Sequence, residues 1–323
     1  MLRGGFRGMA RSHFGMQTTL RQRTGLSGIG VHSGRPVSIT LHPAEANSGV
    51  CFHRAVPEEG RDYEIPANFH HVSATEYCTA VGVPGASVAT IEHLMATLSA
   101  LAIDNVTVEI DGPEVPVMDG SADAFIDAID QVGVVPLAAP RRYIRVTKPV
   151  RVDVGAAFGE FRPYDGTRVE VEIEFASPLV GRQVYAADID GERFRKELAR
   201  ARTFGFLADV EGLWARGFAL GASLDNAIVI ADDRVMNPEG LRFADEFVRH
   251  KALDAVGDIA LAGAPILGCY RSFRGGHHLN IRALDALFAD ESAYEVVEMP
   301  VRRDAGHAEV AGVGVAAYGP DVS

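Results

Sequence analysis

The clearest hydrophobic pattern in the chain lies between residues 240 and 263. Apolar, small and polar positions recur there at alternating steps of four and three, which is the spacing of one face of an α-helix. The positions on this face are Phe243, Phe247, His250, Asp254, Gly257 and Leu261. A second apolar row flanks the first, so we expect the polar pair to face the core. The pattern predicts a long amphipathic helix over residues 240–263.

The polar pair on this helix has two interpretations. An ionised carboxylate cannot be buried without a proton, a cation or a metal beside it. His250 and Asp254 are four residues apart, so both side chains can reach one point, as two ligands of a metal would. A hydrogen bond between them that merely holds two helices together is the alternative. The choice depends on whether the chain offers further ligands.

Shorter patterns predict the remaining elements of the first half. Residues 26–41 read as a β-hairpin with turn glycines, and residues 105–110 as a strand. Residues 87–101 form a second amphipathic helix with Thr90 as its N-cap and with Glu92 and His93 in its first turn. A further helix runs from Ser121 to residue 129. Taken alone, Glu92 and His93 could be an ordinary helix start.

The pattern of strands followed by helices restarts after a proline-containing stretch at residues 131–142. Strands are predicted over residues 143–146, 150–154, 168–175 and 265–273, and helices over 194–201 and 281–288, with two histidines in a loop before the last helix. We therefore predict two α+β domains, residues 17–137 and 142–309, joined by a linker at 138–141. Residues 1–16 and 310–323 are predicted tails, the first rich in arginine and flexible.

Composition narrows the classes of function. A net charge of −12 argues against general nucleic-acid binding, so an anionic substrate would need local Lys and Arg side chains. The three cysteines lie far apart and form no metal or disulfide motif, which is typical of a reducing compartment. No apolar run is long enough for a membrane helix. The apolar, glycine-punctuated segment 203–226 could be core or could line a groove for an apolar ligand.

Four motifs in order resemble one family over nearly the whole chain from Gln17 onward. They are TIEHLMATLSALAIDNVTVEI with VPVMDGSA, then ARTFGF, then FVRHKALDAVGDIAL, then GGHHLN. They resemble the UDP-3-O-acyl-N-acetylglucosamine deacetylases, zinc amidases of lipid A synthesis. The resemblance implies two similar domains, each of layered β-sheets and helices, with the helices packed between the domains and an active site at the domain interface.

The resemblance also implies a role for individual residues. The implied metal ligands are His93, His250 and Asp254. The implied catalytic residues are Glu92 as general base, His277 as general acid, Thr203 at the oxyanion, and Asp258 and Lys251 of the long helix. The implied substrate contacts are Phe204, Ala219, Leu224 and Arg274, with Lys251 and Arg274 as candidates for the diphosphate. GGHHLN carries two histidines; we assign the role to His277 and keep His278 as the alternative.

The expected reaction is hydrolysis of the N-acetyl group of a UDP-sugar that carries an acyl chain. Zinc is the expected metal, although His and carboxylate ligands also accept Fe²⁺ or Co²⁺. We expect a cytoplasmic monomer without nucleic-acid partners or membrane insertion. An amidase acting on another sugar, or a non-catalytic relative, are the alternatives. A nucleotide-sugar transferase and a serine hydrolase are disfavoured because GxxxxGK[ST], GxGxxG after a strand and GxSxG do not occur.

Overall fold

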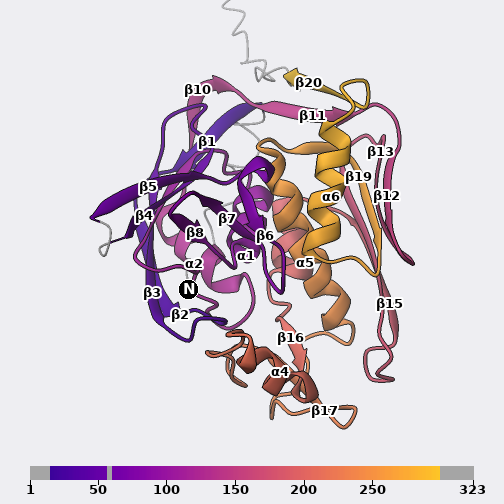
Figure 1. Ribbon diagram of the computed structural model, residues 1–323. Helices are drawn as coiled ribbons and strands as arrows, with labels where there is room; N and C mark the ends of the chain where they lie inside the picture. Colours follow the sequence, from indigo (N-terminus) through magenta and orange to yellow (C-terminus); the bar gives the residue numbers. More distant parts are fainter. Residues whose placement is uncertain (1–14, 57–59, 299–323) are drawn as a thin grey trace, which may run out of the picture.

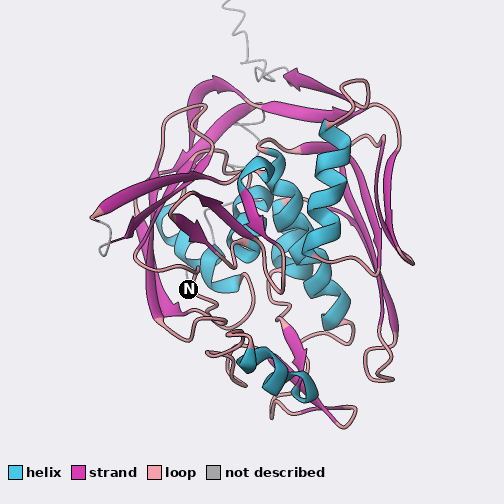
Figure 2. Cartoon of the chain, in the orientation of Figure 1, coloured by secondary structure: helices cyan, strands magenta, loops and turns pink. Residues whose placement is uncertain are grey.

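The computed structural model describes residues 15–56 and 60–298. Two sheets enclose a central layer of helices (Figures 1 and 2). The first sheet has the order β2-β3-β9-β4-β5 and is antiparallel except for the β4–β9 pair. Its strands are β2 (Thr24–Ile29), β3 (Pro36–Pro43), β9 (Val106–Ile110), β4 (Val50–Val56) and β5 (Arg61–Pro66). The predicted hairpin is β2–β3, in which alternate residues of β3 are buried.

The second sheet is built around β19, which pairs with β11, β13 and β14. Its strands are β11 (Arg142–Val146), β12 (Val150–Val154), β13 (Ala157–Arg162), β14 (Thr167–Glu174), β15 (Arg182–Asp188), β19 (Ile266–Phe273) and β20 (Tyr294–Glu298). The pattern predicted β11, β12, β14 and β19 but not the others. A single buried apolar cluster connects residues from both sheets with the helices between them.

Smaller sheets complete the strands. They are β1 (Met16–Leu20) with β10 (Val134–Pro140), then β6 (Val72–Ala74), β7 (Ala80–Val83) and β8 (Ala86–Val88), and then β16 (Phe204–Phe206), β17 (Ile228–Ala231) and β18 (Arg234–Val235). The predicted linker, residues 138–141, therefore overlaps the end of β10, which runs to Pro140. The proposed domain limits remain a prediction. Residues 299–323, including the predicted C-terminal tail, and the greater part of the N-terminal tail lie outside the described residues.

The central helices are α1 (Glu92–Ala100), α2 (Asp123–Val132), α5 (Glu246–Ile259) and α6 (His277–Phe288). Helix α1 packs directly on α5, and a Cβ added at Gly257 of α5 would lie 2.0 Å from the carbonyl oxygen of Glu92. Only glycine permits this approach of the two backbones. Short helices α3 (Gly191–Arg193) and α4 (Val210–Ala215) lie outside this layer, and α4 belongs to the lower end of the molecule with β16 and β17 (Figure 1).

Several predicted boundaries are wrong for local reasons. The first central helix begins at Glu92 rather than residue 87, because residues 86–88 pair in β8. Thr90 is not its N-cap: its φ is 55° and its hydroxyl donates to Glu114. The long helix begins at Glu246 and ends in a 3-10 turn, Ala260–Ala262, before Gly263 at φ 81°. Phe243 consequently precedes the helix instead of lying on its buried face.

Two further predictions are corrected. The helix over 194–201 is a π-helix, Phe194–Leu198, that follows α3. His277 and His278 form the first turn of α6 rather than a loop. The predicted α+β class is confirmed, and no helix of the described residues is long and apolar enough to cross a membrane.

Candidate active site

Three side chains from two central helices converge at one buried point. His93 comes from the first turn of α1, whereas His250 and Asp254 lie one turn apart on α5. The Nε2 atoms of His93 and His250 lie 3.6 and 3.3 Å from Asp254 Oδ1. One possible ligand atom from each residue lies within 4.8 Å of the others, and all three residues are buried. The structure thus brings together the helical pair His250 and Asp254 and the third expected ligand, His93.

The environment of Asp254 suits a cation at this point. Its Oδ1 is buried without a hydrogen-bond partner in the described part of the chain, while Oδ2 accepts from Lys251 Nζ at 2.8 Å. Burial alone would raise the pKa of Asp254, but His250 and Lys251 outweigh it and hold the pKa well below its usual range. An ionised, partnerless oxygen facing two imidazole nitrogens is what a His-His-Asp metal site requires.

The second ring nitrogen of His250 fixes the orientation of this ligand. His250 Nδ1 lies 3.0 Å from the carbonyl oxygen of Ala201 and donates to it, because a carbonyl can only accept. This leaves the Nε2 lone pair directed at the cluster. Burial lowers the pKa of His250 to about 4, so its imidazole is neutral near pH 7, as a metal ligand must be.

Glu92 stands next to His93 in the first turn of α1. Its side chain is buried, and Oε2 accepts a hydrogen bond from the backbone N–H of Thr79 at 3.1 Å. Burial raises the pKa of Glu92, against the attraction of His277 and His93. A carboxylate with a raised pKa beside a metal site is suited to accept a proton from water and release it again.

His277 and Asp258 form a buried ion pair that acts electrostatically on Glu92. His277 Nδ1 donates to Asp258 Oδ2 at 2.9 Å, and Asp258 is completely buried. Burial on its own would lower the pKa of His277, but Asp258 raises it to about 9. His277 therefore carries its proton at neutral pH. His278 is exposed and lies beside Thr75, outside this ion pair.

Two residues that the sequence pattern did not single out complete the surroundings of Asp258. Thr79 donates its hydroxyl to Oδ1 at 2.6 Å, and Asn280 donates its amide to Oδ2 at 2.7 Å. Thr79 thus contacts both Glu92 and Asp258. Asn280 belongs to the GGHHLN motif, whereas Thr79 immediately precedes β7 and lies outside all four motifs.

The ARTFGF segment passes beside His250 and leads into β16. Thr203 is half-buried, and its backbone pairs with Gly120 and Ile228. The Phe204 ring lies 5.0 Å from Phe247 and 6.5 Å from His250, measured between ring centroids. Phe204 therefore lies next to the cluster, and Thr203 lies one residue before it.

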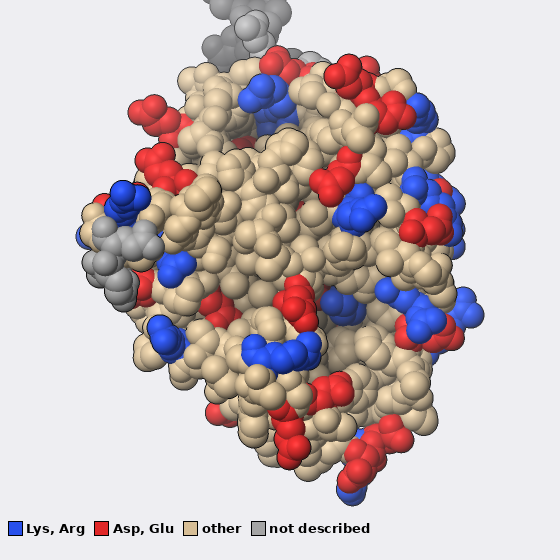
Figure 3. Space-filling view, viewed as in Figure 1, with Lys and Arg blue, Asp and Glu red and all other residues tan. Residues whose placement is uncertain are grey.

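The other expected substrate residues are more dispersed. Lys251 and Arg274 line the same cavity of about 310 Å³ near β14, and Arg274 is exposed. Leu224 is also exposed, while Ala219 is half-buried and accepts a hydrogen bond from Trp214. On the face seen in Figure 3, acidic and basic side chains are interspersed rather than gathered into one basic surface.

The geometry defines a class of protein before any comparison. Two imidazoles and a carboxylate, with a buried Glu and a charged His beside them, are the combination that metal-dependent hydrolases use. A family model described as UDP-3-O-acyl N-acetylglycosamine deacetylase matches residues 17–289. The chain belongs to that family, which is a family of metalloenzymes.

Close relatives carry the same description. The UDP-3-O-acyl-N-acetylglucosamine deacetylases of Brucella ovis, Brucella suis and Brucella melitensis are each 56% identical to this chain over 283 residues. The matched region covers 87% of this chain and 98% of each relative. The resemblance stated from the four motifs is confirmed.

Proposed function

We propose that this protein hydrolyses the N-acetyl group of UDP-3-O-acyl-N-acetylglucosamine. The products are acetate and UDP-3-O-acyl-glucosamine, whose free amine is needed for lipid A biosynthesis. One observation carries the proposal: the partnerless oxygen of Asp254 faces His93 and His250, and a buried Glu92 stands next to these ligands. Membership of the family supplies the substrate class.

Zinc is the metal that we propose for the three ligands. A His-His-carboxylate set is typical of catalytic zinc sites, in which a fourth position is left for water or substrate. A zinc ion bound there would supply Lewis acidity, which lowers the pKa of water and polarises the amide carbonyl. Fe²⁺ would suit the same ligands and is the second candidate.

The proton transfers are assigned to the two groups beside the ligands. Glu92 accepts a proton from the attacking water while the oxygen of that water bonds to the acetyl carbon. His277, kept charged by Asp258, donates its proton to the sugar nitrogen as the carbon–nitrogen bond breaks. The Thr203 hydroxyl donates to the carbonyl oxygen while it carries negative charge. Acetate and the sugar amine then leave.

We assign the substrate's remaining parts to surfaces around this centre. The diphosphate is assigned to Lys251 and Arg274, which supply local positive charge on an acidic protein. The acyl chain is assigned to segment 203–226, in which Leu207, Trp214 and Leu220 are exposed. Phe204 would border the chain near the metal, and Ala219 and Leu224 would influence its preferred length.

The organisation of the protein follows the same proposal. Domain I, residues 17–137, would supply Glu92 and His93, and domain II, residues 142–309, would supply the other metal ligands and His277. The active site would lie where α1 meets α5. We propose a cytoplasmic monomer that meets its amphiphilic substrate without inserting into the membrane.

The test measures acetate release from UDP-3-O-acyl-N-acetylglucosamine by the full chain. The protein is stripped with a chelator and then given one equivalent of zinc, with His250→Ala alongside. We expect activity to vanish on stripping, to return with zinc, and to be absent in the variant. A folded protein that binds one zinc but releases no acetate would refute the substrate, and one that is fully active without metal would refute the mechanism.

A further inference from the structure

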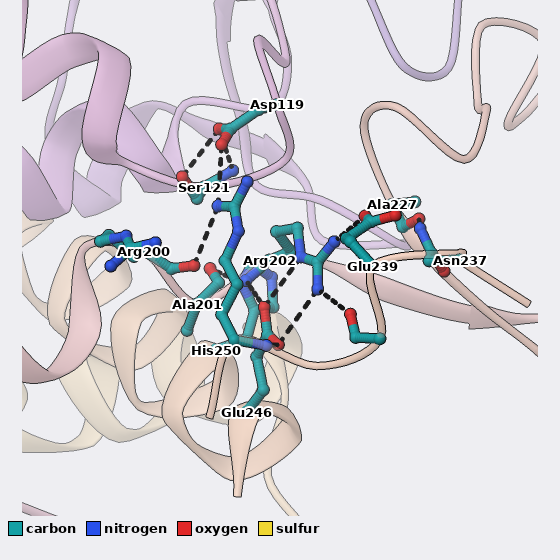
Figure 4. A network of polar contacts seen from close by, with 12 residues as sticks. Asp119, Ser121, Arg200, Ala201, Arg202, Ala227, Asn237, Glu239, Glu246 and His250 are labelled. Atoms are coloured by element: carbon teal, nitrogen blue, oxygen red, sulfur yellow. Dashed lines mark hydrogen bonds and ion pairs between the residues drawn. The ribbon is translucent and has the colours of Figure 1, made fainter. Parts of the chain in front are cut away.

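One peptide group, between Ala201 and Arg202, is held from both sides by α5. Its carbonyl oxygen accepts from His250 Nδ1 at 3.0 Å, and its N–H donates to Glu246 Oε1 at 3.0 Å. Glu246 and His250 lie four residues apart, so the two contacts come from successive turns of α5. Figure 4 shows the peptide and both side chains together. A buried carboxylate is thus connected to a metal-ligand histidine through a single peptide unit.

Glu246 forms an ion pair with Arg202, and removing both charges from water costs free energy. Glu246 is completely buried, and Arg202 is 2% exposed. Arg202 Nε donates to Glu246 Oε1 at 2.9 Å, and the same guanidinium also bonds Gly240 and Glu239. A buried ion pair often contributes less to stability than apolar residues of the same size would. Neither residue takes part in the proton transfers proposed above, and Glu246 Oε2 also accepts from the backbone N–H of Arg242.

We propose that Glu246 is a positioning residue that acts on the metal site through this peptide. A carboxylate that accepts the N–H polarises the amide and makes its carbonyl a better acceptor for the imidazole. The stronger hydrogen bond at Nδ1 raises the basicity of Nε2 and fixes the ring orientation, as a direct carboxylate partner does in other metal sites. Arg202 pairs with Glu246 in the interior, with its Nε 2.9 Å from Oε1. The inference rests on the proposed metal site.

The test compares zinc affinities of Glu246→Gln and Asp245→Asn. Both variants neutralise one acid of the same helix end, but Asp245 is half exposed, bonds the Arg249 side chain and does not contact the peptide. Zinc is titrated against a chromophoric chelator at pH 7. We expect Glu246→Gln to raise the dissociation constant about 10- to 100-fold, the usual effect of removing an outer partner of a metal ligand. Asp245→Asn should leave it within about twofold.

A folded Glu246→Gln protein with the natural zinc affinity would overturn the proposal. Far-UV circular dichroism and thermal unfolding establish the fold of each variant. Should Glu246→Gln not fold, Glu246→Asp retains the charge opposite Arg202 but shortens the reach to the peptide, and it should also weaken zinc binding. In the natural protein, zinc should shift the Arg202 amide proton downfield, and an unchanged resonance would contradict the proposal. If the natural protein itself bound no zinc, the proposed function would fail instead.

Discussion

Replacing Asp258 by Asn removes the charge that keeps the proton on His277. Asp258 is completely buried, and its Oδ2 accepts from His277 Nδ1 at 2.9 Å. Burial then disfavours the charged form of His277, against only the weaker attraction of Glu92. We expect the pKa of His277 to fall from about 9 to its ordinary value of 6.5 or below.

The size of the effect follows from this shift. A change of about 2.5 pH units corresponds to roughly 3 kcal/mol. At pH 7.5, the protonated fraction of His277 falls from about 97% with a pKa of about 9 to about 9% with a pKa of 6.5. Activity that needs this proton therefore falls about tenfold at pH 7.5 and recovers as the pH is lowered. The basic limb of the kcat profile moves toward acid by about 2.5 pH units.

The assay is acetate release between pH 5.5 and 10 at saturating zinc and substrate. Asp245→Asn on the same helix is the matched control and should retain the natural profile. Zinc content and thermal unfolding are measured for each variant, so that loss of metal or fold is recognised. A basic limb that stays in place for Asp258→Asn would show that His277 is not the titrating acid, or that Asp258 does not hold its proton.

Two further substitutions examine the packing and the assignment of the acid. Gly257→Ala places a methyl group against the Glu92 carbonyl and should destabilise the protein by about 1–3 kcal/mol in urea unfolding. Gly212→Ala in α4 is the control, because a Cβ added there has no neighbour within 4 Å. Equal stability of the two variants would contradict the packing argument. His277→Ala should lower kcat about 10²- to 10⁴-fold, whereas the exposed His278→Ala should keep it; the reverse order would exchange their roles.

The metal cluster could be predicted because helical periodicity is a local property. His250 and Asp254 lie one turn apart, and their position on an apolar face indicated that they were buried. His93 could be added only through the resemblance, because nothing in the spacing brings α1 to α5. The contact at Gly257 that joins the helices depends on tertiary structure.

The errors arose where long-range contacts overrode local preference. Thr90 has a side chain that is typical of an N-cap, but its hydroxyl donates to Glu114 and its backbone adopts a positive φ. His277 and His278 follow two glycines, which indicated a loop, yet α6 begins at His277. The hydrogen bonds of Thr79 span 13 and 179 residues, and no periodic pattern reports such distances.

The peptide between Ala201 and Arg202 illustrates the same limit. Arg202 belongs to a recognisable motif, but its partner Glu246 lies 44 residues away. A charged residue within an apolar segment can be solvated or paired, and the sequence does not distinguish these cases. Only the folded structure shows that Glu246 and His250 form hydrogen bonds with the N–H and the carbonyl oxygen of the same peptide group.

The meeting of α1 and α5 has a consequence for the cohesion of the molecule. His93 lies on a helix of the first half, and His250 and Asp254 lie on a helix of the second. An ion held by all three would therefore be a non-covalent cross-link between segments that are more than 150 residues apart in the chain. Such a ligand stabilises the folded state by about 4 kcal/mol when its free concentration is 1,000 times its dissociation constant. Metal supply would then govern how long the protein survives in the cell as well as how fast it works.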